Sequence, residues 1–207
     1  MEEMRINHLF FSYEKNIIED VSLTIPKNAV VKLTGKNGTG KTTFLKILSN
    51  LIRSENLAYD LQIASEASDF EAIRKDRLFI PDKPMFQEEL NGYENITFYR
   101  LLFEYDHHYE QQVLNMCRQL DIEKYLNSDV HTLSLGTRQK LFLAINLCVN
   151  KELYLLDEPF NSLDEASKKN LMKIILDKKN ATFIIVSHEN NQDVLFTKTI
   201  CTDNWLK

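Results

Sequence analysis

The stretch GKNGTGKTT, residues 35–43, carries three of the five glycines in a chain of 207 residues. An apolar run, AVVKLT at 29–34, precedes it, and apolar residues at helical spacing follow it over 41–52. Glycine lets the backbone turn tightly and bring successive N–H groups close to an anion. The stretch therefore predicts a phosphate-binding loop between a buried strand and a helix.

Residues 35–42 match the pattern G-x-x-x-x-G-K-[ST] at every position. In this motif we expect Lys41 to reach the β- and γ-phosphates of a nucleotide and the Thr42 hydroxyl to hold Mg²⁺. The alternative is a glycine-rich turn that only caps a helix. The strand before the motif and the helix after it favour nucleotide binding. The expected nucleotide-binding residues here are Gly35, Lys36, Asn37, Gly38, Thr39, Gly40, Lys41, Thr42 and Thr43.

A second stretch, LYLLDEP at 153–159, indicates the reaction. Its apolar residues predict a buried strand that ends in Asp157 and Glu158. We expect Asp157 to hold Mg²⁺ and Glu158 to orient or deprotonate a water molecule, which favours hydrolysis over transfer to an acceptor. The alternative is that both carboxylates are solvated charges at the end of a strand.

Strand-like and helical patterns alternate at both ends of the chain. Strands are expected at 4–13, 16–25, 29–34, 56–65, 77–81, 152–159, 181–188 and shortly after 198. Helices are expected at 41–52, 94–105, 109–120, 136–149 and about 164–176. The pattern predicts a single α/β domain, with a core of residues 1–85 and 151–207 and a helical subdomain of residues 86–150.

Composition limits the function classes. The chain is 43% apolar and 27% charged, as is usual for globular proteins. It has no apolar run of 18 residues, and its acidic N-terminus does not resemble a secretory signal. The net charge of −5 argues against nucleic acid as a partner. Cys117, Cys148 and Cys201 are widely spaced and are expected to be reduced thiols in the cytoplasm.

Five stretches together resemble the ATP-binding cassette (ABC) ATPases, over nearly the whole chain. In order, they are GKNGTGKT, LSLGTRQK at 133–140, LYLLDE, NSLD at 161–164 and VSH at 186–188. The resemblance implies a P-loop NTPase core with a mixed sheet, the cofactors ATP and Mg²⁺, and ATP hydrolysis coupled to transport.

The resemblance also implies roles for further residues. Tyr13 corresponds to an aromatic ring that stacks on adenine, and the alternative is an ordinary edge-strand tyrosine. Ser134 and Gly136 correspond to the family signature, which contacts ATP held by a second cassette. Ser134 could equally be a plain helix cap. His188 corresponds to the histidine that senses the γ-phosphate, so Glu158, His188 and Lys41 form the expected catalytic set.

Three positions depart from the family pattern. Leu135 and Thr137 replace the usual Gly and Gln of the signature. Asp82 stands where the family usually has a glutamine that approaches Mg²⁺. A carboxylate can bind Mg²⁺, so the expected metal ligands are Thr42, Asp82 and Asp157.

The resemblance implies the ATP-hydrolysing subunit of a transporter, peripheral on the cytoplasmic face of the membrane. The expected partners are a separate transmembrane permease and a second ATPase chain, identical or related. The coupling helix of that permease is expected in the groove around residues 82–105, at exposed aromatic residues such as Phe86, Tyr93, Phe98 and Tyr99. The alternative is that these aromatics form the core of the subdomain. Asp82, the stretch LNGYENI at 90–96 and the short segment after His188 favour an exporter. The alternatives are a soluble ABC ATPase acting in cytosolic assembly or on ribosomes, and a non-hydrolysing regulatory nucleotide-binding module.

Overall fold

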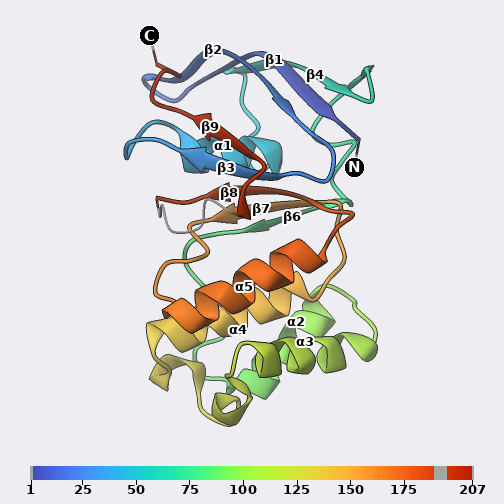
Figure 1. Ribbon diagram of the computed structural model, residues 1–207, viewed down its shortest axis with the longest axis vertical. Helices are drawn as coiled ribbons and strands as arrows, with labels where there is room; N and C mark the ends of the chain where they lie inside the picture. Colours follow the sequence, from blue (N-terminus) through green and yellow to red (C-terminus); the bar gives the residue numbers. More distant parts are fainter. Residues whose placement is uncertain (1, 189–194, 207) are drawn as a thin grey trace. The chain divides into compact units, whose positions relative to one another are not determined.

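The computed structural model describes residues 2–188 and 195–206, and contacts divide the chain into two compact units (Figure 1). Unit 1 comprises Met1–Ile80, Lys151–Glu158 and Lys178–Lys207. Unit 2 comprises Pro81–Asn150 and Pro159–Asp177. Residues 159–177 thus group with the helices of unit 2, whereas the sequence-based division assigns them to the core.

A parallel sheet of five strands forms one part of unit 1. In spatial order these are β6 (Arg77–Ile80), β7 (Leu153–Asp157), β8 (Thr182–Val186), β3 (Val30–Thr34) and β9 (Lys198–Cys201). Every residue of β7 and β8 is buried, which explains their continuous apolar runs. Because all five strands are parallel, their carboxyl ends meet at one edge, and ligands in such sheets bind beyond that edge.

The other sheet of unit 1 is antiparallel. Its order is β2 (Asn16–Ile25), β1 (Met4–Ser12), β4 (Leu57–Ile63) and β5 (Glu66–Ser68). The expectation of an α/β core is confirmed, with its antiparallel and parallel strands in two separate sheets. The two sheets and helix α1 (Lys41–Leu48) contribute to one apolar core, for example through Phe11, Phe44 and Ile184 (Figure 1).

Helix α1 is shorter than its apolar spacing predicts. It ends at Leu48, and Asn50 has a left-handed φ of 57°. Leu51 lies beyond the helix and is 64% exposed, so the expectation that it extends the apolar face was wrong. The left-handed residue turns the chain before the helical pattern is complete.

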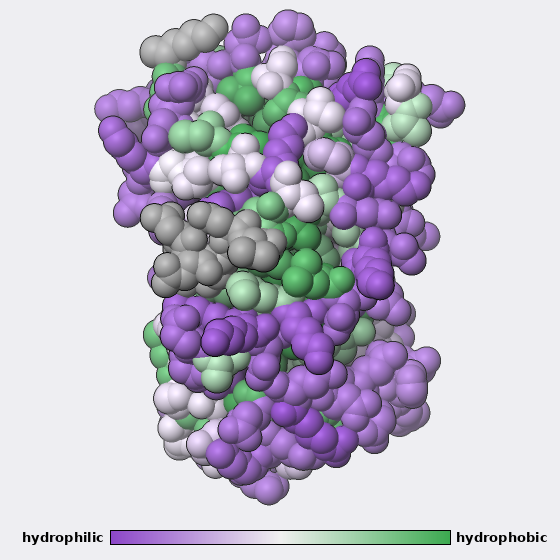
Figure 2. Space-filling view, viewed as in Figure 1, coloured by the Kyte–Doolittle hydropathy of each residue, from purple (hydrophilic) through white to green (hydrophobic). Residues whose placement is uncertain are grey.

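Unit 2 is helical. Its helices are α2 (Gly92–Leu102), α3 (His108–Gln119), α4 (Leu135–Leu147) and α5 (Glu165–Asp177), with short 3₁₀ turns at Glu123–Tyr125 and Val130–Thr132. The buried Tyr109 of α3 donates its hydroxyl to the carbonyl of Ile145 in α4 at 3.0 Å. Figure 2 shows a mostly hydrophilic surface over these helices on the face in view. Among the described residues, no helix combines the length and apolar character needed to cross a bilayer.

Candidate nucleotide-binding site

The predicted phosphate loop joins the end of β3 to the start of α1. Gly35, Gly38 and Gly40 have positive φ angles of 145°, 84° and 91°. L side chains rarely adopt these angles, which explains the concentration of glycine in this stretch. Helix α1 begins at Lys41, so the loop lies at the positive end of a helix.

Lys41 is folded over the loop. Lys41 is only 7% exposed. Its Nζ donates to the carbonyls of Gly35 at 2.7 Å and Lys36 at 2.8 Å. The ammonium group is therefore held among the loop residues. A cation beside the amides of a helix N-terminus favours a polyanion such as the phosphates of ATP.

Thr42 and Asp157 lie together, although 115 residues separate them in the sequence. The Thr42 hydroxyl donates to Asp157 Oδ2 at 2.7 Å. Two hard oxygen ligands beside a phosphate loop fit Mg²⁺, which usually binds one or two protein ligands together with phosphates and waters. The pair therefore fits a metal held jointly with a nucleotide.

Glu158 and His188 also form a pair. His188 Nε2 lies 3.1 Å from Glu158 Oε1, and the Glu158 side chain is 18% exposed. Glu158 has a left-handed φ of 50°, and its N–H donates to the carbonyl of Val186 at 3.1 Å. This conformation is uncommon outside glycine and is often found at functional sites. The ends of β7 and β8 thus bring together two of the three residues expected to be catalytic.

Tyr13 lies in the turn between β1 and β2 and is 58% exposed. Its ring packs edge-to-face on Phe11, with centroids 4.7 Å apart. Ile17, near the start of β2, lies close to the loop. A Cβ added to Gly40 would lie 3.1 Å from the Ile17 side chain. The turn with Tyr13 therefore belongs to a hairpin whose second strand contacts the loop, and the exposed ring is available for stacking.

The expected signature residues lie in unit 2, at the start of α4. Ser134 caps this helix, accepting from the N–H of Thr137 at 3.2 Å. A Cβ on Gly136 would meet the carbonyl oxygen of Ser162 at 2.6 Å, so only glycine fits there without movement. Leu135, where the family usually has glycine, is 62% exposed. The nucleotide contacts expected of Ser134 and Gly136 stay predictions.

Asp82, the third expected metal ligand, also belongs to unit 2 and is exposed. Its role as a ligand stays a prediction, because Thr42 and Asp157 belong to unit 1.

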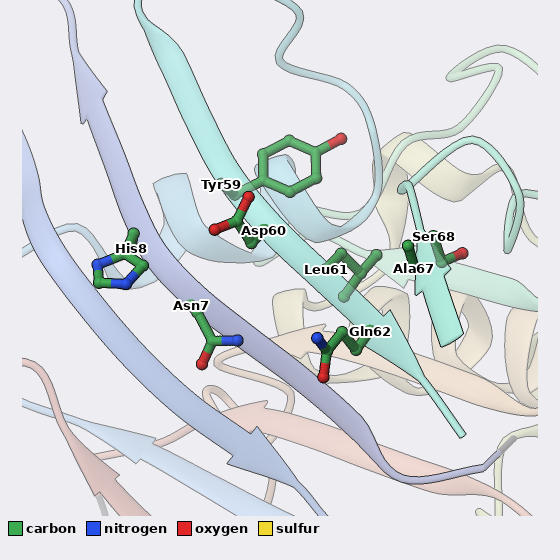
Figure 3. Close-up of a pocket in the computed structure, with 8 residues that line it drawn as sticks. All are labelled: Asn7, His8, Tyr59, Asp60, Leu61, Gln62, Ala67 and Ser68. Carbon is green, nitrogen blue, oxygen red and sulfur yellow. The ribbon is translucent and has the colours of Figure 1, made fainter. Parts of the chain in front are cut away.

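A surface hollow of about 370 Å³ lies on the antiparallel sheet (Figure 3). Its lining comes from β1, β4 and β5 and includes His8, Asp60 and Gln62. None of the predicted site residues lines it. The phosphate loop remains the candidate site because the predicted side chains gather there.

Sequence reasoning missed two residues at this site, Thr202 and Asp203. Asp203 Oδ1 accepts the N–H of Lys36 at 2.7 Å, and the Thr202 and Thr39 hydroxyls are hydrogen-bonded. They are separated from the loop by more than 160 residues and form no recognisable motif. The structure brings them to the loop through the parallel pairing of β9 with β3, which the sequence does not show.

Comparison with known proteins gives a family match. The family model described as ABC transporter matches residues 18–161. A putative ABC transporter ATP-binding protein, AlbC of Bacillus subtilis, is 32% identical over 81% of this chain and 72% of its own length. The tungstate uptake system ATP-binding protein TupC of Peptoclostridium acidaminophilum is 29% identical over 92% of this chain and 89% of its own.

A solved structure shows the same fold. It is the ATP-binding cassette MJ0796, described as a dimeric post-hydrolysis state bound to ADP and phosphate. The TM-score is 0.80 at 20% identity, and the match covers 96% of this chain and 93% of that one. At this identity the likeness supports the fold alone.

Proposed function

Because the chain belongs to the ABC transporter family of ATPases, we propose that it hydrolyses ATP as the peripheral subunit of a membrane transporter. The observation that carries the proposal is the phosphate loop with Lys41 beside the paired oxygens of Thr42 and Asp157. Its partners are a separate transmembrane permease and a second cassette, and it lies on the cytoplasmic face of the membrane. AlbC and TupC, both ATP-binding proteins of transporters, support this assignment.

In the proposed mechanism, the loop amides and Lys41 bind the polyphosphate and offset its charge. Thr42 and Asp157 would hold Mg²⁺, which neutralises charge on the phosphates when bound. Glu158 accepts a proton from, or orients, the attacking water, and His188 fixes the Glu158 carboxylate through their 3.1 Å contact. Ser134 and Gly136 of a second copy would complete the site, and the ATP-binding cassette MJ0796 is itself described as dimeric.

We place the permease contact on α2. A hollow of about 450 Å³ is lined by Tyr93 and Phe98 together with Leu101, which is 63% exposed. Apolar, aromatic hollows of this kind suit an inserted helix. Two of the expected aromatics do not belong to this surface. Tyr99 is buried, which corrects the expectation that it is exposed, and Phe86 packs against Phe142.

The proposed direction is export, supported by Asp82 and the stretch LNGYENI. Import is the competing direction, and TupC, which serves an uptake system, favours it. In proteoliposomes containing the recovered permease, ATP on the cassette side should drive cargo away from the cassette. Accumulation of cargo on the cassette side would contradict export.

Co-purification tests the assignment. The tagged chain, expressed in its native cell, should recover a multi-span membrane protein in stoichiometric amount after gentle solubilisation. Tyr93→Glu with Leu101→Glu should lose this partner while retaining ATP binding, whereas Lys41→Ala should lose ATP binding. Recovery of soluble partners only would favour the cytosolic ATPase. Absence of turnover even with the permease would favour the regulatory module.

A further inference from the structure

The segment that follows β9 lies against the phosphate loop. The parallel register pairs Thr34, the last residue of β3, with Cys201, the last residue of β9. The two backbones therefore leave the sheet side by side, one entering the loop and the other entering residues 202–205. The N–H of Thr202 donates to the carbonyl of Thr34 at 2.8 Å, which continues the pairing one residue beyond the sheet.

Two side chains of this segment hold the loop. The Thr202 hydroxyl lies 3.1 Å from the carbonyl oxygen of Thr34 and also contacts the Thr39 hydroxyl, which lies 2.9 Å from the carbonyl oxygen of Lys36. The two hydroxyl protons are shared among these three contacts. The Asp203 carboxylate accepts the N–H of Lys36 at 2.7 Å. Contacts thus reach the beginning and the middle of the loop. Hydrogen bonds from a backbone N–H to a carboxylate are among the stronger ones in proteins.

The packing between loop and segment is close. A Cβ at Gly35 would overlap Thr202 Oγ1 and lie 3.0 Å from Asp203 Oδ1. Thr202 has no exposed surface. Gly35 is therefore required here for the approach of a second backbone as well as for its own φ of 145°.

Trp205 anchors the end of the segment. Trp205 is buried, and its carbonyl accepts the N–H of Glu19 in β2 at 2.8 Å. Its ring packs edge-on against Phe44 of α1, with centroids 5.0 Å apart. Because α1 follows the loop and Ile17 of β2 lies near Gly40, the segment is fixed to elements that adjoin the loop.

We propose that Thr202 and Asp203 are positioning residues that set the phosphate loop before nucleotide binds. The inference rests on ATP binding at the loop and is independent of the permease and of the transport direction. A loop with three glycines has many unbound conformations, and ordering it costs binding free energy. Contacts that order the loop beforehand reduce this cost. The carboxylate acts as a hydrogen-bond acceptor, and its negative charge is unnecessary for this role.

Three variants distinguish the positioning of the loop by hydrogen bonds from an effect of the Asp203 charge. Asp203→Ala removes the acceptor, Asp203→Asn keeps an acceptor oxygen without the charge, and Thr202→Val keeps the shape without the hydroxyl. Asp60→Ala is the matched control, because Asp60 is an exposed carboxylate of the same unit, at the hollow drawn in Figure 3.

The first readout is amide hydrogen exchange over residues 35–42 without nucleotide. Asp203→Ala and Thr202→Val should each speed this exchange, and Asp60→Ala should leave it unchanged. The second readout is the affinity for a fluorescent ATP analogue, which we expect Asp203→Ala to weaken by about tenfold, since the acceptor that orders the N–H of Lys36 is lost. Asp203→Asn should stay within about threefold of the original protein. The kcat for ATP hydrolysis, measured at saturating ATP, should change little, while the KM for ATP rises.

Unchanged exchange and affinity in Asp203→Ala would overturn the inference. Equal impairment of the Asn and Ala variants would also overturn it, because the acceptor would then be irrelevant. If Asp203→Ala does not fold, Thr202→Val provides the same comparison. A starting protein that fails to bind ATP would defeat the proposed function, while the exchange measurement without nucleotide would still test the positioning of the loop.

Discussion

Glu158 and the adjacent Asp157 have different backbone conformations and different partners. Asp157 completes β7 and bonds Thr42, whereas Glu158 turns out of the strand with a left-handed φ of 50° and lies beside His188. A residue in this conformation is strained by an amount on the order of 1 kcal/mol or more. The turn sends two consecutive carboxylates to different partners. In the proposed function, Asp157 would hold a metal and Glu158 would act on a water molecule.

Glu158→Gln should separate these roles. We expect turnover to fall by about 10²- to 10⁴-fold, because the amide cannot accept a proton in general-base catalysis. ATP affinity should change little, since Lys41 and the loop amides remain. Steady-state ATPase assays and analogue binding measure the two effects.

Glu55→Gln is the matched control for that prediction, because Glu55 is an exposed carboxylate of the same unit. Its turnover should equal that of the original protein. Turnover within tenfold of the original in Glu158→Gln would show that another group acts as the base.

Residues 35–42 could be assigned from the sequence because their motif is local and depends on glycine. Asp157 and Glu158 followed from the end of a buried strand. Thr202 and Asp203 could not be found in this way, because their partners lie more than 160 residues away. The burial of Tyr99 was also missed, since apolar spacing on a helix does not say which face the core covers.

Helix α4 and the chain leading into α5 are fitted to one another. The absence of a side chain on Gly136 leaves room for the Ser162 carbonyl, and Ser162 itself has a left-handed φ of 64°. Lys140, one turn further along α4, donates to Asp164 at 2.9 Å. Asp164 also accepts the N–H of Ser167 at 2.8 Å, which caps the first turn of α5.

Gly136→Ala should therefore disturb this fit. The new Cβ would lie 2.6 Å from a backbone oxygen, so either the helix or the turn must move. We expect a loss of about 1–3 kcal/mol in the free energy of unfolding, as for other overpacked sites. Thermal and denaturant unfolding measure it. The adjacent Leu135→Ala, at an exposed position, should change stability by no more than about 0.5 kcal/mol.

The contact between Lys140 and Asp164 predicts that the stability of the fold depends on pH. The hydrogen bond from Lys140, followed by those from Ser167, lowers the pKa of Asp164 well below its ordinary value. A folded pKa below the unfolded one means that ionised Asp164 stabilises the fold above about pH 4. This stabilisation is lost as the pH falls towards the lowered pKa.

Lys140→Met tests the direction of this pH dependence. The variant should be less stable than the original protein from pH 8 to about pH 5. The difference should shrink as the pH falls below the folded pKa of Asp164 in the variant, which Ser167 still holds below the unfolded value of about 4. Urea unfolding at several pH values measures it. A difference that grows as the pH falls would contradict the assignment.

At the scale of the whole molecule, the exposure of the three cysteines can be used to follow unfolding. Cys201 is exposed, whereas Cys117 and Cys148 are buried. Burial raises the pKa of the Cys117 thiol to about 12. The folded state therefore favours the neutral thiol, and its contribution to stability declines as the pH rises above the unfolded pKa of about 8.5.

Iodoacetamide at pH 8 should consequently label Cys201 first. Cys117 should react only when denaturant opens the fold, because the thiolate is the reactive form. Mass spectrometry of digested protein locates the label. In Cys201→Ser rapid labelling should disappear, and rapid labelling of Cys117 in native protein would refute the burial.

The fold class and most elements could be predicted because long apolar runs and helical periodicity are strong signals. The sequence could not show that the strands divide into two sheets, since pairing depends on contacts distant in the chain. Strand β5 was missed because three residues, Glu66–Ser68, carry no alternation. The placing of residues 159–177 with the helical unit likewise depends on contacts such as that between Lys140 and Asp164.

The position of β3 has a consequence for protein synthesis. This strand carries the phosphate loop, yet its neighbours in the sheet are β8 and β9, which the ribosome makes about 150 residues later. Until then the nascent chain holds an unpaired apolar strand, and the loop has neither its sheet nor Asp203. Nascent chains arrested before residue 182 should therefore fail to retain ATP and should depend on chaperones. The capacity to bind nucleotide should thus arise only once β8 and β9 have been made, although the phosphate loop is made about 150 residues earlier.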